Sequence, residues 1–231
     1  MRKSDFELGM RNKTVIIVAG GKGERMNADI PKQFLEINRK PILMHTIETF
    51  YRYDECVSII VVLPLVQIES WKRLCKKYHF TISHQIVEGG ETRFHSVKNG
   101  LNFADENSLI AVHDGVRPLV SNDTISRCFE NVARFHAVVP VVDLVDSIRY
   151  SDEKENHACD RTKYKLVQTP QIFDGSLLKK AYKQDFSPAF TDDASVVEAI
   201  GTKIHLVEGN RENIKITTNF DLKLVEMMSR L

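Results

Sequence analysis

The chain has 231 residues, of which 42% are hydrophobic and 27% are charged, as in an ordinary globular protein with room for one sizeable domain. Its formal net charge is only +1, whereas nucleic-acid-binding proteins usually present a strongly basic face. No apolar run approaches the roughly 20 residues of a membrane span, so we expect neither nucleic acid nor a membrane as a partner.

The first 13 residues are charged and lack the apolar segment of a secretory signal. We expect them to form an N-terminal extension of a cytoplasmic protein. The four cysteines show no C-x-x-C spacing, so the sequence predicts neither a zinc site nor a disulfide framework. Reduced thiols packed as small hydrophobic groups are the simplest interpretation.

From residue 14 onward, short β-branched runs alternate with amphipathic segments. The runs predict strands at Thr14–Ala19, Val57–Leu63, Ile82–Val87, Leu109–His113 and Ala137–Val142. The segments between them predict helices at Ile42–Tyr53, Ile68–Tyr78, Arg93–Phe103 and Thr124–Phe135. Strands that are apolar throughout are typical of a sheet covered on both faces. We therefore predict an α/β fold with a doubly wound, mostly parallel sheet, in a single domain over residues 14–231.

The first predicted strand leads into a glycine-rich, basic loop at residues 20–26, followed by Pro31-Lys32-Gln33. Glycines let backbone N–H groups approach polyphosphate oxygens closely. The loop is not a Walker A motif, because no Gly-Lys pair precedes Ser or Thr at the required spacing. Met26 stands where a dinucleotide-binding motif has its third glycine. The loop predicts a triphosphate site, with an ordinary βα turn as the alternative.

Two further polar motifs follow predicted strands, where α/β proteins bind their ligands. Residues 88–93, with two adjacent glycines, could read the edge of a base through backbone groups, or could be a plain hinge. After the next strand comes Asp114, a carboxylate of the kind that binds Mg²⁺ together with phosphate oxygens. Arg117 could contact the nucleotide or orient Asp114, and the alternative is a tight Asp-Gly turn. We expect His113 to be a packed or hydrogen-bonded histidine.

A polar stretch at residues 143–164 interrupts the alternation of strands and helices. Its flanks, Leu144–Arg149 and Tyr164–Gln168, resemble strands, so we predict a hairpin that projects from the body. Connections of this length are uncommon in compact domains and are usually functional or disordered. We expect an arm that packs on a second subunit in a homodimer, with a mobile surface loop as the alternative.

The last third of the chain contains two more candidate segments. Thr191 could cap a helix at Ala194–Ile200, with the acids Asp192 and Asp193 in its first turn, and we expect Thr191 to contact substrate. Lys215 lies in Asn213–Thr217, which resembles a strand. A solvated lysine is the alternative interpretation there.

In this order the motifs resemble the 2-C-methyl-D-erythritol 4-phosphate cytidylyltransferase family, over about residues 14–224. The resemblance rests on residues 19–26, 31–34, 89–97, 113–118, 168–171, 191–194 and 213–215. It implies transfer of a cytidylyl group from CTP to a sugar-alcohol phosphate with release of pyrophosphate, in non-mevalonate isoprenoid biosynthesis. It also implies a Mg²⁺ cofactor.

The resemblance implies a role for each matching residue. CTP would be bound by Ala19, Gly20, Gly21, Gly90, Glu91, Ser96, Asp114 and Arg117, with Asp114 also the ligand of Mg²⁺. Charge on the triphosphate would be stabilised by Arg25, Lys32 and Lys215. The second substrate would be bound by Thr169, Thr191 and the arm residue Arg161, the last across the dimer interface.

The chain departs from the family at the start of the arm. The family usually has Pro-Val-x-Asp-Thr, whereas this chain has Leu144 in place of the threonine. Ser147 follows three residues later: either a small insertion moves the hydroxyl to Ser147, which we expect to bind the acceptor, or the role of the threonine is absent. Two other functions remain open at this stage: a ribitol-5-phosphate cytidylyltransferase, and a non-catalytic nucleotide sensor that uses the same pocket.

Overall fold

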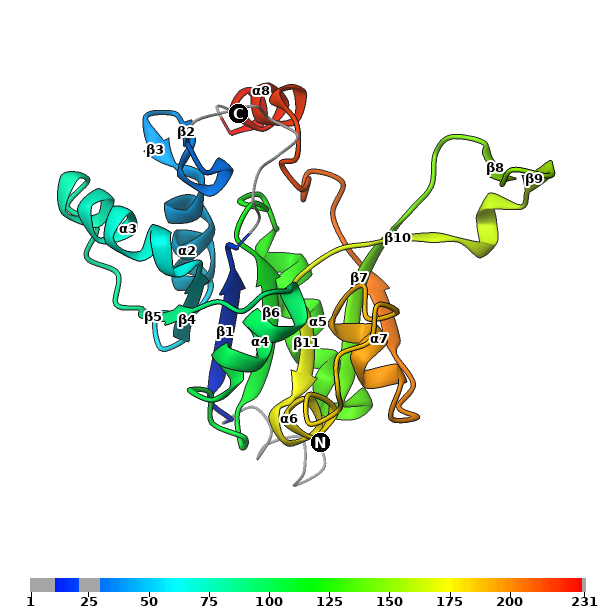
Figure 1. The fold of residues 1–231 in the computed structure, drawn as a ribbon, viewed down its shortest axis with the longest axis horizontal. Coiled ribbons are helices and arrows are strands. Elements are labelled where there is room, and N and C mark those ends of the chain that lie inside the picture. The colour runs from blue at the N-terminus through cyan, green and yellow to red at the C-terminus, as the bar shows by residue number, and fades with distance from the viewer. Residues whose placement is uncertain (1–10, 21–29, 230–231) are drawn as a thin grey trace.

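A computed structural model describes residues 11–20 and 30–229 (Figure 1). The predicted site residues Gly21 and Arg25 lie outside the described residues, as does most of the predicted N-terminal extension. The strands are β1 (Lys13–Val18), β2 (Glu36–Ile37), β3 (Lys40–Pro41), β4 (Ser58–Leu63), β5 (Gln85–Glu88), β6 (Leu109–Asp114), β7 (Ala137–Asp143), β8 (Ile148–Ser151), β9 (Asn156–Cys159), β10 (Lys165–Val167), β11 (Gln171–Asp174) and β12 (His205–Glu208).

The core of the molecule is an eight-stranded sheet with the order β10-β7-β11-β6-β1-β4-β5, to which β12 adds beside β7. The pairs β6–β1, β1–β4, β4–β5 and β12–β7 are parallel. Strand β11 pairs antiparallel with β6 and β7, and β10 pairs antiparallel with β7. The prediction of a mostly parallel sheet is confirmed.

The helices are α2 (Ile42–Tyr53), α3 (Leu65–Lys77), α4 (Arg93–Leu101), α5 (Asn122–Phe135), α6 (Gly175–Ala181), α7 (Asp193–Glu198) and α8 (Asn219–Met228), with short 3₁₀ turns η2 (Lys32–Phe34) and η3 (Arg161–Lys163). Helices α2, α3 and α5 contribute to one hydrophobic cluster on the sheet, and α4, α6 and α7 to another (Figure 1). Both faces of the sheet are therefore covered. Within the described ranges, no helix combines the length and apolarity needed to cross a membrane.

The position of β1 in the middle of the sheet explains why its sequence is apolar throughout. Val15 and Ile17 belong to one hydrophobic cluster and Ile16 to the other. Successive side chains of a strand point to opposite faces, so a strand buried on both faces has no polar position in its middle. The register places Val18, at the end of β1, opposite Val62 on one side and Asp114 on the other. The carboxyl ends of three parallel strands thus meet at one edge.

The arm differs in detail from the predicted hairpin. Its base is the pair β7–β10, in which Leu166 lies opposite Val142. Its tip is a separate two-stranded sheet of β8 and β9, which extends away from the body (Figure 1). The predicted projecting hairpin is therefore present, but its strands are not the predicted segments 144–149 and 164–168: the partner strands lie closer in sequence, so that Ile148 pairs with Cys159.

Three local predictions were also inaccurate. Strand β5 begins at Gln85 and not at Ile82. Residues 213–217 form no strand; Ile216 is instead buried in a small cluster with Val116 on the loop after β6 and Val225 on α8. Helix α7 is capped by Asp192, whose side chain accepts a hydrogen bond from the Ser195 amide, and not by Thr191.

Candidate active site

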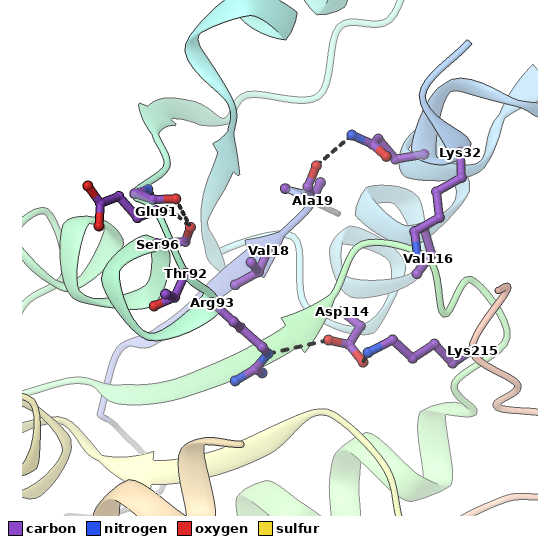
Figure 2. Close-up of a pocket in the computed structure, with 13 residues that line it drawn as sticks. Val18, Ala19, Lys32, Glu91, Thr92, Arg93, Ser96, Asp114, Val116 and Lys215 are labelled. Atoms are coloured by element: carbon purple, nitrogen blue, oxygen red, sulfur yellow. Dashed lines mark hydrogen bonds and ion pairs between the residues drawn. The ribbon is translucent and has the colours of Figure 1, made fainter. Parts of the chain in front are cut away.

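A pocket of about 320 Å³ opens at the edge where β1 and β6 end, beside the start of α4 (Figure 2). This is the position expected for a ligand site in an open α/β sheet. Its described lining includes many of the predicted site residues: Ala19, Gly20, Lys32, Gly90, Glu91, Ser96, Asp114 and Lys215. Gln33, Thr92 and Arg93 line it as well.

One wall of the pocket is the loop between β5 and α4. The Gly90 amide donates a hydrogen bond to Oγ of Ser96 at 3.1 Å, which folds the loop over the first turn of α4. A Cβ at position 90 would collide with the Cβ of His95, so only glycine fits this close approach. Thr92 caps α4 by accepting a hydrogen bond from the His95 amide. The loop leaves Gly90 and Glu91 exposed at the pocket.

The second wall carries a carboxylate surrounded by cations. Oδ2 of Asp114 lies 3.1 Å from Nε of Arg117 and 3.0 Å from Nζ of Lys215. Nε of Arg93 lies 3.7 Å from the other oxygen, Oδ1. Figure 2 shows Arg93 and Lys215 approaching the carboxylate from opposite sides. Asp114 is therefore held in place by residues from three separate parts of the chain.

The electrostatics follow from this arrangement. Burial alone would raise the pKa of Asp114, but the positive charges of Arg93, Lys215 and Arg117 outweigh it and hold that pKa well below its usual range. The carboxylate is thus ionised at any physiological pH. Three cations face two carboxylates here, Asp114 and the ion-pair partner of Arg93, Asp193, so this wall carries one excess positive charge, which suits an anionic ligand.

Behind the pocket, a buried hydrogen-bonded chain orients the backbone of Asp114. Burial lowers the pKa of His113 to about 4, so its ring is neutral at physiological pH. Nε2 of His113 lies 3.0 Å from the Arg117 carbonyl and must carry the proton, which leaves Nδ1 to accept from the Thr169 hydroxyl at 3.1 Å. The same hydroxyl accepts from the Asp114 amide. The expectation that His113 is a hydrogen-bonded, packed residue is confirmed.

Lys215 is positioned without regular secondary structure. Nη1 of Arg117 donates to the Asn213 carbonyl at 2.7 Å, and Nδ2 of Asn213 donates to the Thr169 carbonyl at 2.7 Å. The Ile216 amide donates to the Val116 carbonyl at 3.0 Å. These bonds hold the residues on both sides of Lys215 against the loop after β6, so its ammonium group reaches Asp114.

Lys32 enters from the opposite side of the pocket, on the 3₁₀ turn η2. The adjacent Gln33 is fully buried, and its Nε2 donates to the Ala19 carbonyl at 2.6 Å and to Oε1 of Gln67 on α3. This side chain ties η2 to the end of β1. The sequence pattern predicts no role for Gln33, and its position directly after Lys32 is the one signal that points to it.

Five predicted site residues are not in the described lining of the pocket, and one of them, Arg117, adjoins it through its ion pair with Asp114. Thr169 is buried, with its hydroxyl engaged by Asp114 and His113. Thr191 is exposed next to the start of α7. Ser147 and Arg161 are exposed on the arm, where Arg161 donates to the Val145 carbonyl. Roles for these residues stay predictions.

Sequence reasoning missed the pair Arg93 and Asp193. Nη2 of Arg93 donates to Oδ2 of Asp193 at 2.6 Å, and Asp193 is fully buried. The sequence interpretation treated Asp193 as a first-turn acid of a helix. No signal in the local pattern reveals its partner, since 100 residues separate the two.

The donor set limits how a metal ion can be held here. The structure, in the ranges it describes, holds no cluster of three or more His, Cys, Asp or Glu side chains suited to a metal ion. Two carboxylates, Asp114 and Glu91, line the described pocket, and they lie on different walls. Mg²⁺ usually keeps several waters and takes one or two carboxylates plus substrate phosphates. Asp114 therefore fits a metal ion that arrives with a polyphosphate, and does not fit one bound by protein alone.

The pocket can bind an anion beside a loop whose glycine backbone is exposed. Lys32 and Lys215 approach it from different elements, and Arg93 and Arg117 flank the carboxylate. None of these groups is a nucleophile with a paired base, because the histidine beside Asp114 is buried with both nitrogens bonded. Such a site can align charged reactants and stabilise developing negative charge.

Comparisons with known proteins agree with this geometry. The family model described as 2-C-methyl-D-erythritol 4-phosphate cytidylyltransferase matches residues 13–230. The enzyme of that name from Bacteroides thetaiotaomicron is 57% identical over 92% of this chain and 97% of its own length. The crystal structure of 4-diphosphocytidyl-2C-methyl-D-erythritol synthase from Anaerococcus prevotii aligns over the whole of both chains with a TM-score of 0.81 and 26% identity. The cytidylyltransferase structure from Thermus thermophilus covers 96% of this chain and all of its own, with a TM-score of 0.77 and 30% identity.

Proposed function

The chain belongs to the 2-C-methyl-D-erythritol 4-phosphate cytidylyltransferase family, and from that premise we propose that its pocket is the site of cytidylyl transfer. The protein is a nucleotidyltransferase that joins CTP and 2-C-methyl-D-erythritol 4-phosphate to form 4-diphosphocytidyl-2-C-methyl-D-erythritol and pyrophosphate, in isoprenoid biosynthesis. The observation that carries the site assignment is the ionised Asp114 at the end of β6, bracketed by Lys215 and Arg117.

We assign the base of CTP to the wall formed by Gly90, Glu91 and Ser96. Backbone groups of Gly90 and the carboxylate of Glu91 are exposed at the pocket and can bond the polar edge of a cytosine. Ser96 keeps this loop in place through the Gly90 amide. Ala19 and Gly20 line the neighbouring edge of the pocket, and we propose that they bind the nucleotide there together with Gly21, the last on the sequence resemblance.

We assign the triphosphate to the basic side of the pocket, with Lys215 on the α-phosphate and Lys32 and Arg25 on the departing pyrophosphate. The acceptor phosphate is already an anion near neutral pH, so the attack needs no general base. The contribution of the protein is alignment and charge stabilisation. Lys32 and Lys215 come from opposite walls, which suits two groups that bind different phosphates.

We propose Asp114 as the protein ligand of a Mg²⁺ ion that enters with CTP. A bound Mg²⁺ would neutralise charge on the triphosphate oxygens. The residues Arg117 and Lys215 hold one oxygen of Asp114, which fixes the direction of the carboxylate.

We propose that the arm, about residues 143–164, completes the acceptor site in a homodimer. Five large hydrophobic side chains are exposed on it and its base: Val145, Tyr150, Tyr164, Leu166 and Val167. Ser147 and Arg161 of one subunit would then bind the sugar phosphate of the other, with Thr169 and Thr191 facing the same substrate. The remainder of residues 14–231 would act as one catalytic domain. We also propose a cytoplasmic location, because all four cysteines are free thiols.

Pyrophosphate release tests the function and the acceptor. The purified protein, with CTP and MgCl₂, should release pyrophosphate when 2-C-methyl-D-erythritol 4-phosphate is added and turn over ribitol 5-phosphate poorly. Equal or faster turnover of ribitol 5-phosphate would overturn the acceptor assignment. Binding of CTP with no release for either acceptor would point to a nucleotide sensor.

A further inference from the structure

The two oxygens of Asp114 have different surroundings. Oδ2 is within hydrogen-bond distance of both Lys215 and Arg117, at 3.0 and 3.1 Å. Oδ1 has Arg93 as its cation neighbour, at 3.7 Å, which is too long for a hydrogen bond. The protein therefore occupies one oxygen of this carboxylate and leaves the other for a ligand in the pocket.

Arg93 stays at this distance because a second carboxylate binds it more closely. Its Nη2 donates to Oδ2 of Asp193 at 2.6 Å, a short charge-assisted hydrogen bond. Asp193 is fully buried, whereas Asp114 borders the pocket. The guanidinium group is thus anchored on the side away from the ligand.

Asp193 is itself fixed from several directions. The Tyr182 hydroxyl donates to its Oδ1 at 2.6 Å. Its backbone lies at the start of α7, where Oε1 of Gln171 accepts from the Ala194 amide at 2.8 Å. The Tyr182 ring stacks on Phe94, next to Arg93, with ring centroids 4.8 Å apart. Asp193 is fully buried next to this aromatic packing, and the low local dielectric strengthens its bond to Arg93.

We propose that Asp193 is a positioning residue for nucleotide binding: it holds Arg93 back from Asp114 and so keeps Oδ1 of Asp114 available to Mg²⁺-bound CTP. This inference rests on the proposed function of the pocket. Asp193 does not touch the ligand and acts only through Arg93. The buried pair spans residues from α4 and α7, so it also connects the base-binding loop to the start of α7.

Removing the negative charge of Asp193 should release Arg93 toward the nearest remaining carboxylate, which is Asp114. A guanidinium hydrogen-bonded to Oδ1 would then compete with the ligand. Asp193→Asn keeps the shape of the side chain and should weaken Mg²⁺-dependent CTP binding by about ten- to a hundredfold, the equivalent of one hydrogen bond to a charged group. In steady-state assays KM for CTP should rise while kcat at saturating Mg²⁺ and CTP stays within about threefold.

The double variant Arg93→Gln with Asp193→Asn provides the decisive comparison. It buries two neutral amides that can bond each other, and it leaves no cation free to move onto Asp114. Because Arg93 lines the pocket, the reference is the single variant: we expect the double variant to bind CTP with Mg²⁺ at least threefold more tightly than Asp193→Asn alone. Asp192→Asn is the matched control, because it neutralises the adjacent acid while an asparagine can still cap α7. Isothermal titration calorimetry with CTP and MgCl₂ measures all four proteins, and circular dichroism confirms that each is folded.

The possible outcomes are separable. Wild-type affinity in Asp193→Asn, or equally weak binding in the single and double variants, would overturn the role of Asp193. If the single variant does not fold, the double variant is compared with Arg93→Gln alone; because Asp193 acts only through Arg93, a difference of more than threefold in CTP affinity between these two proteins contradicts the proposal. A wild-type protein that binds no CTP would overturn the proposed function of the pocket and this inference with it.

Discussion

The hydroxyl of Thr169 accepts a hydrogen bond from the backbone amide of Asp114 at 3.1 Å, across 55 residues of sequence. It donates its own proton to His113, whose other nitrogen is bonded to the Arg117 carbonyl. The backbone of Asp114 at the pocket wall is therefore held by a buried network of hydrogen bonds, which connects β6 to the residues just before β11. This network gives Thr169 a structural role, although the residue lies behind the pocket and not in its described lining.

Thr169→Val removes that hydroxyl and keeps the shape of the side chain. The Asp114 amide and His113 then lose a buried partner, and we expect a loss of about 1–3 kcal/mol in the free energy of unfolding. Urea denaturation followed by circular dichroism measures this loss. Thr169→Ser keeps the hydroxyl and is the control; equal stability of the two variants would contradict the assigned role.

Lys215→Met removes the ammonium group next to Asp114 and keeps most of the side-chain volume. We expect the rate of pyrophosphate release to fall by about 10²–10³, the usual effect of removing one well-placed charge-stabilising group. The exposed Lys223 on α8 offers a matched control, Lys223→Met, that should retain wild-type activity. A rate within threefold of the wild type in Lys215→Met would remove this lysine from the catalytic machinery.

Stability should decrease as the pH falls from about 6.5 to 4. Burial holds the pKa of His113 at about 4 in the folded protein, against 6.5 for a free histidine, so the unfolded chain takes up a proton first in this range. Burial also lowers the pKa of His84, which acts in the same direction. Above pH 6.5 this contribution is complete; over the full window His113 alone accounts for roughly 3 kcal/mol.

Urea denaturation at pH 7.5 and pH 5 measures this dependence. His113→Asn lacks the titratable ring and is the comparison, because its stability should depend less on pH than that of the wild type. A free energy of unfolding that is the same at both pH values would show that His113 is not held neutral.

Replacing residues 146–161 with a short Gly-Ser linker should convert a dimer into a monomer. The tip sheet of β8 and β9 is removed, while the pair β7–β10 at the base remains intact. Light scattering coupled to size-exclusion chromatography measures the mass of both proteins. CTP binding should persist in the shortened protein, since the pocket is built from other segments. A shortened protein that remains dimeric would contradict the role of the arm.

Much of the fold was accessible from local patterns. Strands β1 and β4 were predicted to within one residue at each end, because continuous apolar runs reflect burial on both faces. Residues 213–217 misled the same reasoning: Ile216 is buried, but against Val116 and Val225 in a small cluster beside the sheet edge. Alternating apolar residues indicate that a segment is buried, but they do not indicate whether its backbone pairs with a strand.

The site divides in the same way. The sequence by itself determined which loops carry glycines, cations and a carboxylate, and the alternation of strands and helices that places such loops at the ends of strands. Only the tertiary structure decided which side chains meet. Arg93 binds Asp193 across 100 residues and faces Asp114 in the pocket wall, and Thr169 supports Asp114 from behind. Local periodicity depends on neighbours along the chain, whereas the choice of ion-pair and hydrogen-bond partners depends on distances that exist only after the sheet has assembled.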